Sequence, residues 1–255
     1  MSISGVGSGY TDYSSYGKLA SGKALQTAAD GAAELAIAEK EESQARGLDK
    51  GTQNAETAKD MLRVTDGAQA SITDYLQRIR ELAIDASSGL KTDSDKEKIQ
   101  VEVDQLKQGI ADVAKQTQFN TKNILDGTET GFNIATDANG NGKTVTTGDA
   151  TLEALGIKDF DVTKDYDLNV IDSALEKITT DRAAGGAQYN TLESTINYNN
   201  YASQNTTASQ SRLEDLDMPK AISEQKKNQL LDTYQTMMQK KQMEDKENQN
   251  RLLFS

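Results

Sequence analysis

Apolar residues recur at helical spacing in the amino-terminal half of the chain. Between residues 72 and 86 they fall three or four positions apart and share one helix face, which predicts a helix packed on a partner. The segment 87–89 (SSG) ends this pattern. Ser94 followed by Glu97 matches a capping box, so we expect a second helix to begin there. The apolar positions expected to form the packing seam of these two helices are Ile72, Leu76, Ile79, Ile99, Val103, Leu106, Ile110 and Val113.

The carboxy-terminal half carries a matching pattern. Steps of four and three residues predict coiled-coil-like packing, and they continue here through about 45 residues without proline. Some positions in this spacing are polar, such as Asn199 and Thr206. They weaken the seam, because burying a polar group without a partner costs about 1–3 kcal/mol. The apolar seam positions of this half are Ile171, Leu175, Ile178, Leu192 and Ile196.

A joint and a last helix are expected beyond this seam. Pro219, the single proline, marks the joint, and the helix should run from Ala221 to about Asn248. Its apolar residues are too sparse for a helix that is stable alone, so it needs a partner helix.

The middle of the chain, residues 128–167, is rich in Gly, Asn and Thr. It predicts two short strands joined by a Gly/Asn turn, and then another extended piece at residues 156–167. Asp137, Asn139 and Asn141 resemble the start of a calcium loop, but the twelfth position is Gly148 and no helix pattern follows. A plain hairpin turn is therefore the favoured interpretation.

Together these patterns predict a mostly α fold. We expect an elongated antiparallel helical bundle or coiled-coil rod, formed by both ends of the chain, with a small insert that contains a β-hairpin. The composition agrees, because only 35% of the 255 residues are hydrophobic and there is no Trp. Thin bundles need only a narrow apolar seam on each helix.

Charge and composition exclude several classes of function. The net charge of −12 repels nucleic acid and anionic membrane, and no apolar run is long enough to span a bilayer, so neither partner is expected. The chain has no Cys and no His, which removes thiol nucleophiles, disulfides, the commonest general base and the usual kinds of zinc site. Acidic residues near position 95 are explained by helix capping. We predict no catalytic, cofactor or metal site, and no enzymatic activity.

Several segments resemble bacterial flagellins. The amino-terminal ones are, in order, LASGKALQTAADGAAELAI, QARGLDKGTQNAETAKDML, LQRIRELAIDASSG and QTQFNTKNILDG. The carboxy-terminal ones are IDSALEKITTDRAAGGAQYNTLESTI and SRLEDLDM. The resemblance implies a structural subunit of the flagellar filament that supports motility and polymerises with itself and other flagellins. It also implies an export chaperone and a cap protein as partners, and an extracellular location reached through the flagellar type III channel.

The resemblance also implies a domain organisation. The expected parts are an atypical flexible segment (1–18), an amino-terminal helical rod (19–127), a short variable β-prone insert (128–167), a carboxy-terminal rod helix (168–218) and an inner-tube-like helix (219–255). Residues 1–18 depart from the family because they have no apolar stripe, and they also lack the pattern of a cleavable secretory signal. The alternative is therefore a flagellin-like protein that does not polymerise and instead binds or regulates flagellar components.

The resemblance implies one more partner. In flagellins that the vertebrate Toll-like receptor for flagellin recognises, the contact surface matches Arg78, Leu82 and Glu102 of this chain. A purely structural interpretation fits the same residues, since Leu82 lies on the apolar stripe while Arg78 and Glu102 fall on the solvated side.

Overall fold

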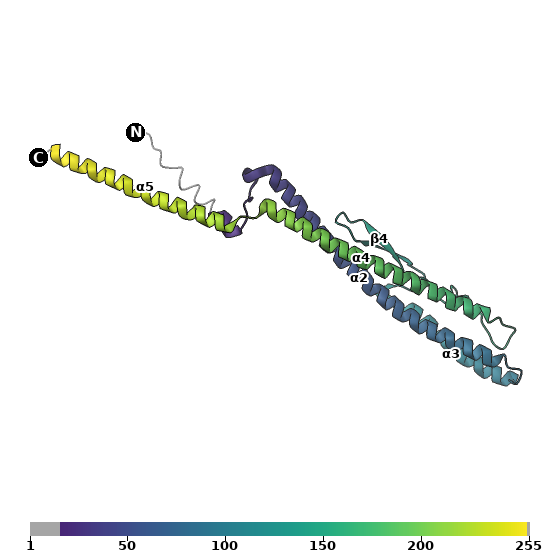
Figure 1. Cartoon of the computed structure of the whole chain (residues 1–255). Coiled ribbons are helices and arrows are strands. Elements are labelled where there is room, and N and C mark those ends of the chain that lie inside the picture. The colour runs from purple at the N-terminus through teal and green to yellow at the C-terminus, as the bar shows by residue number, and fades with distance from the viewer. Residues whose placement is uncertain (1–15, 254–255) are drawn as a thin grey trace. The chain divides into compact units, whose positions relative to one another are not determined.

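A computed structural model describes residues 16–253 of the chain, with side chains as far as residue 248, and long helices dominate it (Figure 1). The long helices are α2 (Ala28–Ala86), α3 (Asp93–Gln116), α4 (Asn169–Glu214) and α5 (Met218–Leu253). The strands pair as two antiparallel hairpins, β1 (Gln118–Phe119) with β2 (Lys122–Asn123), and β3 (Gly131–Ala135) with β4 (Gly142–Thr146). The predicted mostly α fold with a small hairpin insert is confirmed. Most of the segment 1–18 lies outside the described residues.

The chain folds into two compact units. Among the described residues, the first combines 16–43 with 205–253, and the second is Gln44–Gln204. Helices α2 and α4 contribute residues to both units.

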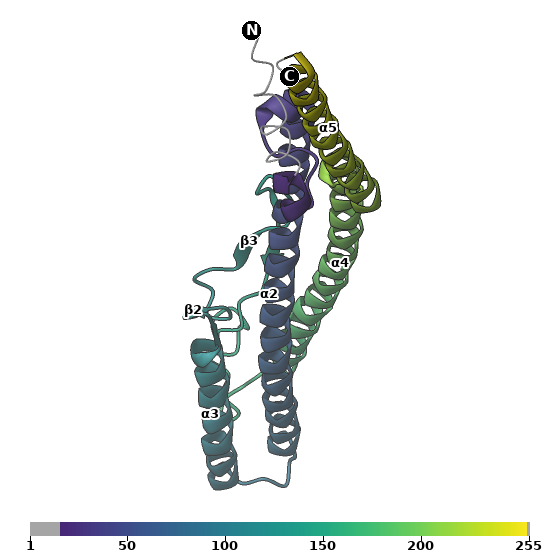
Figure 2. The same cartoon turned by 90° about the vertical axis from the view of Figure 1, so that its left-hand side faces the viewer.

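In the second unit, α2 lies between α3 and α4 (Figure 2). The α2–α4 pair is antiparallel, because Arg80 near the end of α2 binds Asp172 at the start of α4 (Nε to Oδ1, 2.6 Å), whereas Lys59 binds Glu193 further along (Nζ to Oε2, 3.1 Å). The α2–α3 pair is also antiparallel, since a short turn joins the two helices. Residues from both halves of the chain therefore form one bundle.

Apolar side chains from all three helices fill the centre of this bundle. The seam residues that are almost fully buried are Ile72, Leu76, Ile79, Val103, Ile110, Ile171, Ile178 and Leu192. The seam residues that are partly buried and pack against the same core are Ile99, Leu106, Val113, Leu175 and Ile196. Large apolar side chains recur along one face of each helix, which is why these helices pack side by side.

Two polar residues at seam positions of α4 have hydrogen-bond partners. Asn199 is only 2% exposed, and its Nδ2 donates to the carbonyl oxygen of Thr136 at 2.7 Å. Ser203 Oγ donates to Asp49 Oδ1 at 2.7 Å. The cost expected for unpartnered polar groups in this seam therefore does not arise at these two positions.

The segment 156–167 was expected to be extended, and this expectation is wrong. It forms a series of turns after the β3–β4 hairpin. Its backbone is held by local bonds, such as the one from the Thr163 N–H to Asp161 Oδ1 (2.9 Å), and by Lys107 Nζ of α3, which donates to the carbonyl of Phe160 (3.1 Å). Ile157 and Val162 are fully buried. The segment closes the core of the bundle, and no neighbouring strand pairs with it.

The start of α3 also differs from the expectation. Thr92 is the N-cap, and it exchanges hydrogen bonds with Asp95, so the capping box lies two residues before the predicted Ser94–Glu97 pair. The Asp95 N–H donates to Thr92 Oγ1 and the Thr92 N–H donates to Asp95 Oδ2, each at 3.3 Å. This reciprocal pairing satisfies two amides that a helix start otherwise leaves free.

The β1–β2 hairpin was not predicted, and it follows directly after α3. Its two turn residues, Asn120 and Thr121, have φ values of 48° and 65°. Positive φ at both central positions is the geometry of the tight turns that match the twist of paired strands. The residues after it, Ile124 and Leu125, are buried in the core of the second unit.

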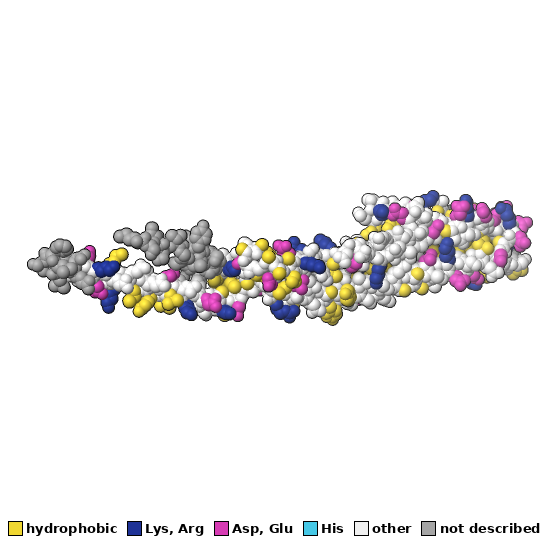
Figure 3. All heavy atoms as spheres, turned by 90° about the horizontal axis from the view of Figure 1, so that it is seen from above, with side chains coloured by type: hydrophobic (Ala, Val, Ile, Leu, Met, Phe, Trp, Pro, Cys, Tyr) yellow, Lys and Arg dark blue, Asp and Glu magenta, His cyan; other side chains and the backbone are white. Residues whose placement is uncertain are grey.

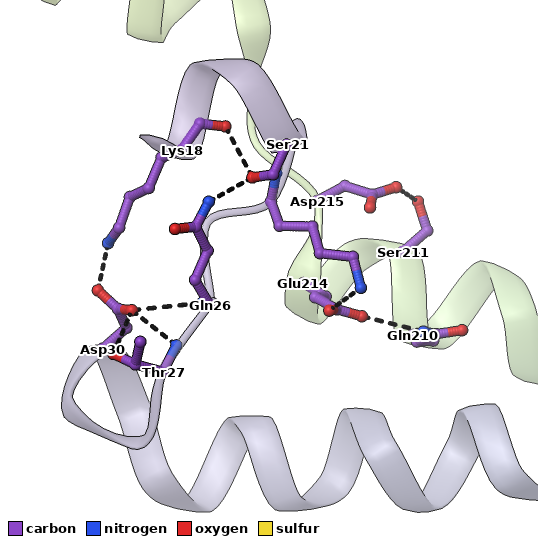
Figure 4. Close-up of polar contacts among 10 residues, drawn as sticks. Lys18, Ser21, Gln26, Thr27, Asp30, Gln210, Ser211, Glu214 and Asp215 are labelled. Atoms are coloured by element: carbon purple, nitrogen blue, oxygen red, sulfur yellow. Dashed lines mark hydrogen bonds and ion pairs between the residues drawn. The ribbon is translucent and has the colours of Figure 1, made fainter. Parts of the chain in front are cut away.

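In the first unit, the segment before α2 is joined to the segment between α4 and α5 (Figure 4). The Ala24 N–H donates to the carbonyl of Glu214 at 2.7 Å, and the Leu216 N–H donates to the carbonyl of Gly22 at 2.8 Å. Gly22 has a φ of 71°, a conformation that suits glycine. Pro219 lies in the first turn of α5, where its missing N–H costs no helical hydrogen bond.

Candidate functional site

Helix α5 carries a surface of unburied apolar side chains. None of the side chains from Met218 to Asn248 is buried, and hydrophobic groups gather along this helix (Figure 3). The large exposed ones are Met218, Ile222, Leu230, Leu231, Tyr234, Met237, Met238 and Met243. Burying a Leu or Met side chain contributes about 1.5–3 kcal/mol. Among the described residues none covers these side chains fully, so burial of this face of α5 would stabilise the helix.

Charged groups hold the base of α5 in place. Lys23 forms an ion pair with Glu214, and Gln210 Nε2 donates to the same carboxylate at 2.9 Å (Figure 4). The hydrogen bond from Lys23 is the main reason that the pKa of Glu214 is lowered. Hydrogen bonds from Lys18 and Thr27 likewise hold the pKa of Asp30 below its usual value. These contacts fasten the segment before α2 and join it to the end of α4, four residues before α5 begins.

Two of the three candidate receptor-contact residues meet on the surface of the second unit. Arg78 donates from Nε and Nη2 to Glu102 Oε1 at 3.0 and 2.8 Å, and from Nη1 to Glu81 at 3.1 Å. The side chains of Arg78 and Glu102 are 50% and 45% exposed. Leu82 is 7% exposed and belongs to the core. The solvent-exposed part of the candidate receptor contact is therefore mainly the pair of Arg78 and Glu102.

A cavity of about 460 Å³ interrupts the seam between α2 and α4. It exists because Gly185 and Gly186 have no side chains, opposite Leu62 of α2. The hydroxyl of Thr147 is buried there without a hydrogen-bond partner, and burial raises the pKa of Asp181 in its wall. Its lining has no nucleophile paired with a base, so we interpret the cavity as a packing gap.

The loop that resembles a calcium site uses its ligand groups on itself. Asp137 Oδ1 accepts the N–H groups of Asn139 (2.9 Å) and Asn141 (2.7 Å), while Oδ2 accepts from Asn141 Nδ2 (2.9 Å). The bond from the Asn141 side chain is the main cause of the lowered pKa of Asp137. Within the described residues no three acidic side chains come together as metal ligands would.

No described helix has both the length and the apolar composition needed to cross a bilayer.

Sequence reasoning missed several residues that shape the second unit. Ile157, Phe160 and Val162 close its core, and Tyr166 donates from its hydroxyl to the carbonyl of Ala83 at 2.6 Å. The signal was present in the return of apolar residues through the segment 157–166, but the segment was interpreted only as an extended piece.

Comparison with known proteins agrees with this helical architecture. The bacterial flagellin N-terminal helical region matches residues 13–130, and the bacterial flagellin C-terminal helical region matches residues 168–246. The flagellar filament 33 kDa core protein of Treponema phagedenis is 37% identical over 237 residues, covering 84% of this chain and 82% of the relative. The flagellin of Bacillus subtilis (strain 168) is 34% identical over 254 residues, covering 84% and 83%.

Solved structures show the same likeness. The crystal structure of Bacillus cereus flagellin superposes with a TM-score of 0.52 at 30% identity, covering 58% of this chain and 88% of that one. A putative flagellar hook-associated protein from Vibrio parahaemolyticus has a TM-score of 0.59 at 14% identity, which shows a shared fold alone. The family regions at both ends and the relatives that match more than four fifths of the sequence lead to one conclusion: the chain belongs to the bacterial flagellin family.

Proposed function

We propose that this chain is a structural subunit of the extracellular bacterial flagellar filament and thereby supports motility. The observation that carries the proposal is the similarity, over 84% of the chain, to proteins named as filament core proteins and flagellins. The family is structural, and we propose no catalytic role. The partners of the chain are then further copies of itself and other flagellins.

The unburied face of α5 gives this proposal a physical basis. A helix with exposed Leu230, Tyr234 and Met237 gains stability when apolar surfaces of neighbouring molecules cover it. A contact between two different surfaces of identical chains can repeat without closing, which generates a helical polymer. Self-association of this kind depends on an exposed apolar face of a helix. It does not require a ligand pocket.

Polymerisation of the purified chain tests the proposal. Residues 1–18 lack an apolar stripe, so we expect poor assembly by the chain alone and clear incorporation when it is mixed with a conventional flagellin. Electron microscopy of pelleted filaments, with the chain identified by mass, gives the result. Absence of the chain from filaments that the other flagellin forms would contradict the proposal and favour the alternative, a non-polymerising protein that binds flagellar components.

The remaining features of the proposal follow from the family. We propose an export chaperone and a filament cap protein as transient partners, and residues 19–127 and 168–218 as the rod that carries the insert 128–167. Pull-down of the chain from bacteria that express each candidate partner tests these contacts. The control is the same chain without residues 219–255, the helix whose exposed apolar side chains are proposed to be covered by partners.

Receptor recognition at the surface formed by Arg78 and Glu102, over the buried Leu82, is the last part of the proposal. The exposed pairing of Arg78 with Glu102 supports it, because both charges are available to a partner. Glu102→Gln should reduce activation of the vertebrate flagellin receptor in reporter cells, while the free energy of unfolding changes by less than about 1 kcal/mol, as expected for an exposed ion pair. Unchanged activation by the folded variant would remove the receptor from the list of partners.

A further inference from the structure

The turn between β3 and β4 contains the same dipeptide twice, as Asn139–Gly140 and Asn141–Gly142. In an Asn–Gly pair the glycine nitrogen can approach the asparagine carboxamide closely, because glycine has no Cβ to obstruct it. In an unfolded chain the two pairs are chemically alike. The folded turn places them in different surroundings, and this difference determines which one can react.

Asn139 lies at the open end of the turn. It is exposed, and its carboxamide takes part in no hydrogen bond with the described residues. The following Gly140 has a φ of 82°, and a Cβ placed on it would meet no atom within 4 Å. The Gly140 N–H makes one long hydrogen bond, to the carbonyl of Asp137 at 3.3 Å. The reacting groups therefore have space to move toward each other.

Asn141 is exposed as well, but hydrogen bonds restrain both its side chain and its backbone. Its Nδ2 donates to Asp137 Oδ2 at 2.9 Å, and its own N–H donates to Oδ1 at 2.7 Å. Its carbonyl accepts from the N–H groups of Thr136 and Asp137, at 3.0 and 3.1 Å. The following Gly142 is the first residue of β4, and a Cβ on it would lie 1.9 Å from the carbonyl oxygen of Ile134. The carboxamide of Asn141 must therefore break its hydrogen bond to Asp137 before it can turn toward the glycine nitrogen.

We propose that Asn139 is a site of spontaneous deamidation and that Asp137 protects Asn141 from the same reaction. The Gly140 nitrogen loses its proton to hydroxide and attacks Cγ of Asn139. A C–N bond forms to give a five-membered succinimide, and the bond to the side-chain nitrogen breaks and releases ammonia. Water then opens the ring at either carbonyl, leaving aspartate or isoaspartate at position 139. No oxidant or reductant is involved.

Conversion of Asn139 changes the contact between the β3–β4 hairpin and α2. The Asn139 N–H donates to Asp137 Oδ1, so a new carboxylate at position 139 stands beside an existing one. Isoaspartate also lengthens the main chain by one carbon next to Ala138. This residue touches α2, since a Cβ on Gly47 would lie 2.8 Å from the Ala138 Cα. Deamidation therefore loosens a contact between the insert and the bundle in molecules that have aged.

The test compares both asparagines in the folded and in the denatured chain. Cleavage after lysine releases the segment 123–143 with both sites, and fragmentation mass spectrometry locates the conversion after incubation at mildly alkaline pH. We expect similar rates at both sites in denaturant. In the folded chain, Asn141 should react at least about ten-fold more slowly than Asn139, which corresponds to about 1.4 kcal/mol in activation free energy. Equal rates in the folded chain, or no conversion of Asn139 there, would overturn the inference.

Two variants assign the cause. Asn139→Gln should nearly abolish the conversion at position 139 and leave Asn141 protected, because the longer side chain can form only a six-membered ring, which closes much more slowly. Asp137→Ala should raise the rate at Asn141 several-fold, since its carboxamide loses its acceptor. Circular dichroism shows whether each variant is folded. A folded Asp137→Ala chain with Asn141 still protected would contradict the role given to Asp137.

Discussion

The end of α2 and the middle of α5 both carry apolar side chains on a long helix, yet they differ in what covers them. Ile72 and Leu76 of α2 are fully buried by α3 and α4. Leu230 and Tyr234 of α5 are 72% and 61% exposed. Helical spacing of apolar residues thus identifies a face that needs a partner, but it does not say whether the same chain supplies that partner.

The largest effect should come from one substitution made in both helices. Leu76→Ala empties a buried site and should lower the free energy of unfolding by about 2–5 kcal/mol. Leu230→Ala is the matched control, and it should change the free energy of the single subunit by less than about 0.5 kcal/mol. Denaturant unfolding of the unassembled protein measures both. A comparable loss in the two variants would mean that α5 is already covered within one molecule.

Asn199 gives the next largest effect. Replacing this buried residue by Ala leaves the carbonyl of Thr136 without its side-chain donor, which should cost about 1–3 kcal/mol. Asn190→Ala, on an exposed position of the same helix, is the control and should be nearly neutral. If unfolding curves of both variants coincide with that of the parent, the contact between α4 and the hairpin contributes nothing to stability.

The glycine gap in α4 predicts a gain. Gly185→Ala and Gly186→Ala should each raise stability by about 1 kcal/mol, because alanine is the better helix former. A Cβ at Gly185 would also meet Leu62 at 3.9 Å, an ordinary contact, whereas one at Gly186 meets nothing within 4 Å. We therefore expect the larger increase in melting temperature at Gly185. A loss at this position would show that the cavity must stay open.

The smallest effect concerns acid. Hydrogen bonds from Thr163 and Lys164 lower the pKa of Asp161 to about 2. Because the folded pKa lies below the unfolded value of about 3.8, the carboxylate stabilises the fold above that value, and its contribution is lost as the pH falls toward 2. Asp161→Asn should make stability depend less on pH in that window. If the free energy of unfolding changes with pH by the same amount in the variant and the parent across this window, Asp161 does not contribute.

The helices and the β3–β4 hairpin were predictable because their signals are local. A helix face repeats within a few residues, and a Gly/Asn turn between two β-prone runs is a short pattern. Local signals were less able to place the cap of α3, since Thr92–Asp95 and Ser94–Glu97 both fit a capping pattern. The choice between them depends on where the preceding turn ends.

Contacts between distant segments could not be predicted. Asn199 looked like a weakness in the seam, because nothing near it in the sequence indicates that the carbonyl of Thr136 lies opposite. Val162 was placed in an extended piece, although its side chain is completely buried in the core. The need of α5 for a partner was visible in its sparse apolar residues, but the sequence pattern does not identify what covers the helix.

The pairing of α2 with α4 also affects when the protein can fold. Lys59 and Glu193 are 134 residues apart, and Asp49 and Ser203 are 154 apart. A chain made at about 5–20 residues per second needs roughly 7 to 30 seconds to extend from one member of such a pair to the other. During that interval the apolar face of α2 has no α4 to cover it. Contacts of such long range also slow refolding, because a large loop must close before they form.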